Sequence, residues 1–108
     1  MDRLRIRRNP SAPSGGSLDP AYAQYLLSVD AQLVDVRSPA EFAHGALAGA
    51  VNLPMEALCY GYGYHRLHKR RPVILCGASE CRSRRAAQLL AGRGFSRIYY
   101  LAGLNLAG

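Results

Sequence analysis

The sequence has no apolar run that approaches the about 20 residues needed to span a bilayer, and we expect no membrane segment. Its first residues, MDRLRIRRNPSAPSGGS, are basic but lack the apolar stretch of a secretory signal. Cysteine is scarce: the three residues, an odd number without a secretion signal, argue against a disulfide framework and for free thiols in a reducing cytoplasm. At 108 residues the chain is long enough for one hydrophobic core and too short for two. We therefore expect a single cytoplasmic domain.

Acidic residues are also scarce, since 7 Asp and Glu stand against 14 Lys and Arg and leave a net charge of +7. A basic balance can indicate nucleic acid as the partner. Four arginines of the excess lie within the first eight residues, however, and the aromatic residues are not interleaved with basic ones as in a single-strand binding platform. We interpret residues 1–16 as a flexible basic leader and residues 17–108 as the folded domain, and we do not expect nucleic acid as a partner.

Helical and strand patterns alternate along the folded part. One helix begins with Asp19 as its cap and Pro20 at its first position, and another begins with the capping box of residues 38–41, Ser-Pro-Ala-Glu. Four short apolar runs are predicted to be buried strands, at residues 33–36, 50–53, 73–75 and 98–101. The alternation predicts an α/β fold with a central, mostly parallel sheet of about five short strands and helices on both faces.

The most informative segment is VILCGASECRSRRAAQLL, in which a buried strand ends at Cys76 and a loop leads to a helix expected from about Ser83. Loop amides and the helix N-terminus present unpaired N–H groups and positive partial charge, and three nearby arginines add full charge. Such surroundings favour a thiolate, so Cys76 is predicted to be a nucleophile whose pKa lies below the reference value of about 8.5. The predicted anion-binding loop comprises Gly77, Ala78, Ser79, Glu80, Cys81, Arg82 and Ser83. On this pattern alone, a small buried thiol at a strand end is an equally good interpretation.

A second signal lies earlier in the chain. The segment DVRSPAEF, residues 35–42, followed by Gly45, Gly49-Ala50 and Asn52-Leu53-Pro54, resembles the opening signature of the rhodanese-like domain family. The rest of the chain resembles the second half of the family pattern in order and spacing. The matching residues are the Cys76 loop, Arg82-Ser83, Ala86-Ala87, Leu89-Leu90, Gly94-Phe95 and Tyr99-x-Leu-x-Gly103. The resemblance implies a parallel sheet between helices, with Cys76 as the catalytic cysteine. It also implies that sulfane sulfur passes through a persulfide on Cys76, from thiosulfate or a persulfide donor to a thiophilic acceptor such as a protein thiol.

The loop length departs from the family pattern. In typical sulfurtransferase members four residues separate the cysteine from an arginine or threonine, whereas five separate Cys76 from Arg82. The longer loop looks like that of cell-cycle phosphatases and arsenate reductases of the same fold, where it wraps a tetrahedral oxyanion. Glu80 inside the loop argues against a bound phosphate. We favour sulfur transfer, and the alternatives are such an oxyanion enzyme or a non-catalytic rhodanese-like binding module.

Other polar residues have both structural and functional interpretations. We interpret Asp35 and Arg37 as a structural ion pair or hydrogen-bond network at the end of a strand. Cys81 could resolve an oxidised or persulfidated Cys76 as a disulfide, or could be an incidental thiol. The two histidines of YGYGYHRLHKRR, residues 60–71, do not combine with the cysteines at a usual zinc-ligand spacing, and we expect no metal and no cofactor. The tyrosines of the same predicted surface loop could rim a substrate or partner site, or could simply be solvated.

Overall fold

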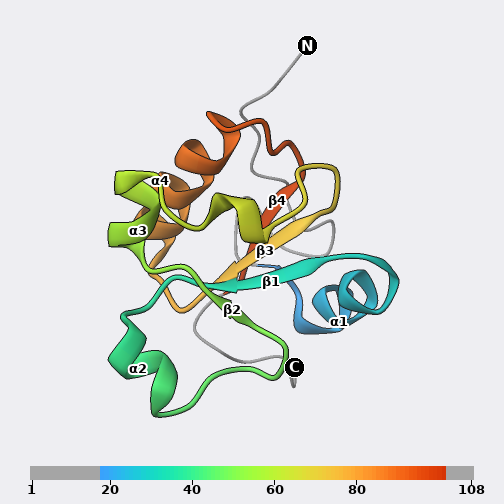
Figure 1. Ribbon diagram of the computed structural model, residues 1–108. Helices are drawn as coiled ribbons and strands as arrows, with labels where there is room; N and C mark the ends of the chain where they lie inside the picture. Colours follow the sequence, from blue (N-terminus) through green and yellow to red (C-terminus); the bar gives the residue numbers. More distant parts are fainter. Residues whose placement is uncertain (1–17, 102–108) are drawn as a thin grey trace.

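The computed structural model describes residues 18–101, which Figure 1 shows in colour. The predicted leader, residues 1–16, lies outside this range. Helices and strands alternate within it, as the sequence pattern predicts. None of these helices is long and apolar enough to cross a membrane.

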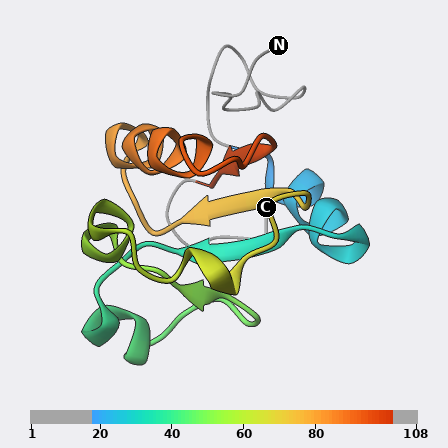
Figure 2. The ribbon, with the colours of Figure 1, turned by 45° about the horizontal axis from the view of Figure 1, so that its top comes forward.

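Residues 18–101 contain one sheet of four parallel strands. β1 (Gln32–Asp35) and β3 (Val73–Cys76) lie at its centre, and β2 (Val51–Asn52) and β4 (Ile98–Tyr100) form its edges. Figure 2 shows the spatial order β4, β3, β1, β2. The parallel pairing is the predicted one, although these residues supply four strands where about five were expected. Every residue of the two central strands is buried, as both faces of the sheet are covered.

Helices cover both faces of the sheet. They are α1 (Pro20–Val29), α2 (Pro39–Ala43), α3 (Met55–Tyr60), the 3₁₀ helix η1 (Tyr64–Arg66) and α4 (Glu80–Ala91). In Figure 1, α3 and α4 lie on one side of the sheet and α1 on the other. Two hydrophobic cores result, one between the sheet and α3 and α4 and one between the sheet and α1. We call these the α4-side core and the α1-side core.

Capping signals in the sequence begin two of the helices where predicted. The Asp19 carboxylate accepts a hydrogen bond from the Tyr22 amide at 3.3 Å, with Pro20 in the first helical position of α1. At α2 the capping box is complete: Ser38 Oγ accepts from the Glu41 amide at 3.2 Å, and Glu41 Oε1 accepts from the Ser38 amide at 3.1 Å.

Helix α4 begins at Glu80, three residues earlier than predicted. The reason is its cap, because Ser79 Oγ accepts a hydrogen bond from the Arg82 amide at 3.3 Å. The predicted seven-residue anion-binding loop is therefore divided. Residues 77–79 form a short loop, and residues 80–83 form the first turn of α4.

Candidate active site

Cys76 is the last residue of β3, and its side chain lies in the α1-side core. Side chains alternate along the strand, so Val73 and Leu75 pack in the α4-side core whereas Ile74 and Cys76 pack in the α1-side core. Cys76 is fully buried, with 0% of its surface exposed. The thiol therefore does not lie on the face that α4 covers.

This burial determines the ionisation of Cys76. Burial, and to a lesser extent the Asp35 carboxylate, raises the pKa of the Cys76 thiol to about 12, and the Arg37 guanidinium opposes both effects. The predicted pKa below about 8.5 is thus wrong for this conformation. The sequence showed the nearby helix end and arginines, but it did not show that the thiol is covered by core residues.

Asp35 and Arg37 form a bidentate ion pair beside Cys76. Asp35 is fully buried at the end of β1 and is the register partner of Cys76 in the sheet. Arg37 Nη2 donates to Asp35 Oδ2 at 2.9 Å, Arg37 Nε donates to Asp35 Oδ1 at 3.1 Å, and the Arg37 amide donates to the same oxygen at 2.9 Å. These hydrogen bonds raise the pKa of Arg37 above its ordinary value. The buried carboxylate is therefore paired, and both side chains are held at the carboxyl edge of the sheet.

Gly77 is required where the chain leaves Cys76 and passes over this pair. Its φ of +86° lies in the left-handed region. A Cβ at this position would lie 2.9 Å from Asp35 Oδ1 and 2.7 Å from Arg37 Cγ. The loop of residues 77–79 consequently packs directly on the ion pair, which leaves no room for a side chain at position 77.

A cavity of about 280 Å³ opens beside this loop. It is lined by Val36, Arg37, Ser38, Pro39, Glu41, Pro54, Met55, Glu56, Gly77, Ala78 and Arg82. Two arginines and two glutamates thus line the same small space. The beginnings of α2 and α3 and the first turn of α4 meet here, because parallel strands bring the segments that follow them to one edge of the sheet. This space is the candidate site of catalysis, and we call it the catalytic cavity.

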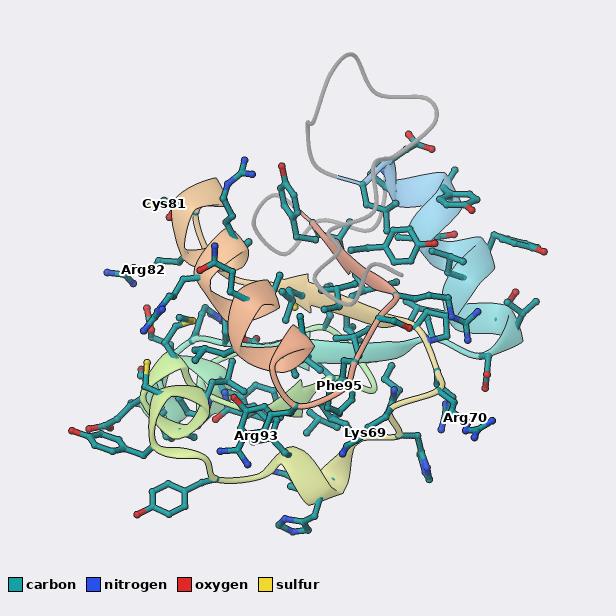
Figure 3. All side chains as sticks on the ribbon, turned by 90° about the horizontal axis from the view of Figure 1, so that it is seen from above. Lys69, Arg70, Cys81, Arg82, Arg93 and Phe95 are labelled. Atoms are coloured by element: carbon teal, nitrogen blue, oxygen red, sulfur yellow. The ribbon has the colours of Figure 1, made fainter. Side chains whose placement is uncertain are left out.

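The other predicted site residues lie on or near the first turn of α4. Cys81 and Arg82 are exposed, and Figure 3 shows both side chains directed outward from the helix. Ser83 is fully buried, and its Oγ has no hydrogen-bond partner within residues 18–101. Ser79 is exposed and caps the helix, while Ala78 is half-buried beside the cavity. All three cysteines are free thiols, and Cys59 and Cys81 are exposed.

Sequence reasoning missed two contributors to the site. Asn52, at the end of β2, donates through Nδ2 to the carbonyl oxygens of Asp35 at 3.0 Å and Arg37 at 2.9 Å. Glu56, in the first turn of α3, adds a carboxylate to the catalytic cavity. Asn52 stood in the Asn52-Leu53-Pro54 part of the family signature but was given no role, and its strand, predicted to be buried, is half-buried. Nothing in the sequence pattern placed Glu56 near Cys76.

Comparisons with known proteins agree with this fold. The family model described as Rhodanese-like domain matches residues 19–103. The uncharacterized protein YqhL of Bacillus subtilis is 44% identical over 73 residues, which cover 68% of this chain and 56% of YqhL. The thiosulfate sulfurtransferase GlpE of Ectopseudomonas mendocina is 36% identical over 86 residues, which cover 80% of this chain and 77% of GlpE. The human single-domain sulfurtransferase TSTD1 superposes with a TM-score of 0.57 at 25% identity, covering 87% of this chain and 93% of TSTD1.

Proposed function

This chain belongs to the rhodanese-like domain family, and on that premise we propose that it is a sulfurtransferase that carries sulfane sulfur on Cys76. The observation that carries the proposal is the position of Cys76. It ends a central parallel strand, beside a small cavity that Arg37 and Arg82 line. The matched segment spans just over half of the length of YqhL. Any activity of the whole protein is therefore a proposal.

The first half-reaction loads the cysteine. The Cys76 thiolate attacks the outer sulfur of thiosulfate, a new S–S bond forms, and sulfite leaves with the electron pair of the broken bond. Cys76 then carries a persulfide anion, and the total charge is unchanged. Arg82 and Arg37 are the cations that would hold the dianionic donor in the catalytic cavity by charge-assisted hydrogen bonds. A persulfide donor delivers the same sulfur atom and leaves as a thiolate.

The buried thiol requires that the site opens before this step. The thiol must leave the α1-side core and face the catalytic cavity, where the amides of α4 and Arg82 would stabilise its anion. Residues 77–79 join Cys76 to α4, so this segment would have to rearrange, and Gly77 gives its backbone a wide range of φ values. We therefore propose that the described conformation is the resting thiol form and that donor binding favours an open form.

The alternative oxyanion enzyme is less well supported. Because α4 begins at Glu80, Arg82 lies within the helix and only residues 77–79 form a loop. Five residues between Cys76 and Arg82 therefore do not form an extended cradle in this conformation. Among the relatives described above, those whose names state an activity are sulfurtransferases.

Mass spectrometry of the intact protein tests the proposal. After treatment with thiosulfate and removal of excess reagent, the protein should gain the mass of one sulfur atom, and cyanide should remove it as thiocyanate. Cys76→Ser should abolish the gain, whereas the matched variant Cys59→Ser should retain it. Cys81→Ser separates the two interpretations of that thiol, since a resolving thiol shortens the lifetime of the persulfide. No sulfur gain would favour the non-catalytic module, and a phosphoryl adduct from an aryl phosphate would favour the oxyanion enzyme.

A further inference from the structure

Two tyrosines at the end of α3 stand out from the surface beside the catalytic cavity. Tyr60 is 71% exposed and Tyr62 is 67% exposed, and their ring centroids lie 6.4 Å apart. Tyr64, two residues further on, turns inward: its hydroxyl donates to the Leu58 carbonyl at 2.8 Å. The alternation with glycine thus presents two of the three rings to the outside and anchors the third.

The backbone that carries Tyr60 and Tyr62 is tightly held. Gly61 ends α3 with a φ of +86°, and the Tyr62 amide donates to the Ala57 carbonyl at 2.8 Å. A Cβ at Gly61 would lie 2.6 Å from Arg93 Nη2, and one at Gly63, whose φ is +85°, would overlap Leu53. Arg93 in turn stacks over the Tyr64 ring at 4.5 Å from its centroid. Because this backbone is already constrained, little backbone conformational entropy is lost when a partner covers the two rings.

The exposed tyrosines continue the catalytic cavity. A hollow of about 540 Å³ is lined by Pro39, Pro54, Glu56, Ala57, Tyr60 and Tyr62. Pro39, Pro54 and Glu56 also line the catalytic cavity, so the two spaces share one rim. We call this hollow the tyrosine surface. A molecule that covers it extends directly to the loop that follows Cys76.

The shape and charge of the tyrosine surface point to a particular occupant. Rings that project from the surface fit into depressions of a macromolecule, whereas a small ligand is held by enclosing walls. Among residues 18–101, no cationic side chain lines the hollow, and Glu56 adds a carboxylate to it. At the adjoining cavity, hydrogen bonds from the Ser38 amide and hydroxyl lower the pKa of Glu41, so this carboxylate is ionised at neutral pH. Arg37 in that cavity is paired with Asp35, so Glu41 and Glu56 leave the α2 and α3 side of the shared rim acidic, and this side favours positive charge on the partner.

We propose that the tyrosine surface docks a protein acceptor whose reactive cysteine is flanked by basic residues. This inference rests on the proposed function and assigns the acceptor class of the same site. The acceptor thiolate attacks the outer sulfur of the Cys76 persulfide, and the S–S bond to Cys76 breaks. Cys76 leaves as a thiolate, and the acceptor carries the sulfur away as its own persulfide. Tyr60 and Tyr62 hold the acceptor segment while Glu56 and Glu41 pair with its basic side chains.

The test uses the full chain and three matched peptides, each with one central cysteine flanked by two lysines, two glutamates or two serines. Sulfur transfer from thiosulfate to each peptide and to cyanide is measured for the wild type. The same rates are measured for the double variant Tyr60→Ser/Tyr62→Ser, for Glu56→Gln and for Tyr25→Ser. Tyr25 is the control because it is a tyrosine with 57% exposure on α1. Affinity for peptides in which serine replaces the cysteine is measured by fluorescence anisotropy, which does not depend on sulfur transfer.

The lysine peptide should be the best acceptor. The double tyrosine variant should lower its kcat/KM, relative to the cyanide kcat/KM of the same variant, by at least about tenfold. Glu56→Gln should reduce the preference for the lysine peptide over the glutamate peptide, and Tyr25→Ser should change neither ratio. Equal rates for the three peptides, or unchanged ratios in the double variant, would overturn the inference. The inference would also be overturned if cysteamine, a small cationic thiol, accepted sulfur with the same kcat/KM as the lysine peptide. If no persulfide forms at all, the proposed function fails, and tyrosine-dependent anisotropy still decides whether the docking surface exists.

Discussion

Cys76 should react slowly with alkylating agents in the resting protein, in spite of its position next to a helix N-terminus. Its pKa is raised from the ordinary 9.0 to about 12. At pH 8 the thiolate fraction of Cys76 is then about 10⁻⁴, compared with about 10⁻¹ for a thiol of ordinary pKa. Since only the thiolate reacts, the alkylation rate of Cys76 should be about three orders of magnitude below that of an unhindered thiol. Burial of the sulfur slows the reaction further.

The raised pKa also makes stability depend on pH in a defined direction. The folded thiol keeps its proton while the unfolded thiol loses it, so this contribution to stability is complete below about pH 9 and decreases as the pH rises toward 12. By pH 10 the wild type should have lost about 1.4 kcal/mol, and the whole difference of three pKa units corresponds to about 4 kcal/mol. Cys76→Ala removes the titrating group, so the free energy of unfolding of this variant should not show the loss that the Cys76 thiol causes as the pH rises.

Two measurements check these values. Alkylation by iodoacetamide is followed peptide by peptide with mass spectrometry between pH 6 and 10, with exposed Cys59 as the internal comparison. Urea unfolding of the wild type and of Cys76→Ala at pH 7 and at pH 10 gives the stability term. A Cys76 alkylation midpoint below about 8.5, or parallel pH dependence of the two unfolding free energies, would refute the buried resting thiol. Added thiosulfate should accelerate the loss of free Cys76 thiol if donor binding opens the site.

Three substitutions around Cys76 give further expectations. Gly77→Ala should cost at least about 1–2 kcal/mol of stability from the positive φ alone and should lower sulfur transfer, as measured by urea unfolding and thiosulfate turnover. Asp35→Asn removes a charge that raises the pKa of Cys76 and leaves the opposing Arg37, so the alkylation midpoint of Cys76 should move to lower pH. The same variant should lower the free energy of unfolding by about 3–5 kcal/mol because the buried ion pair is broken. An unchanged midpoint in that variant would contradict the electrostatic role of Asp35. Ser79→Ala removes the cap of α4 and should cost about 1 kcal/mol in thermal or urea unfolding, and a loss below about 0.3 kcal/mol would show that the cap bond contributes little.

Some aspects of the site follow from short-range sequence signals. The capping residues Asp19 and Ser38 marked the starts of α1 and α2, because a side-chain acceptor three residues before an unpaired amide acts locally. The start of α4 was misplaced for the same kind of reason. Ser79 and Ser83 are both residue types that cap helices. Only the folded backbone shows that Ser79 Oγ accepts a hydrogen bond from the Arg82 amide, whereas Ser83 is buried.

The amino-acid sequence by itself determined the alternation of strands and helices, the parallel sheet that follows from it, and the place of Cys76 at the end of a strand. The tertiary structure alone decided on which face of the sheet the Cys76 sulfur lies, how completely it is covered, and which distant residues line the cavity beside the loop that follows it. Glu56 and Tyr62 lie at the carboxyl edge of the sheet because the register of parallel strands brings the segments after β1, β2 and β3 together. The pKa of the Cys76 thiol depends on how completely core residues cover the sulfur, since desolvation of the thiolate outweighs the positive charges that the sequence places nearby.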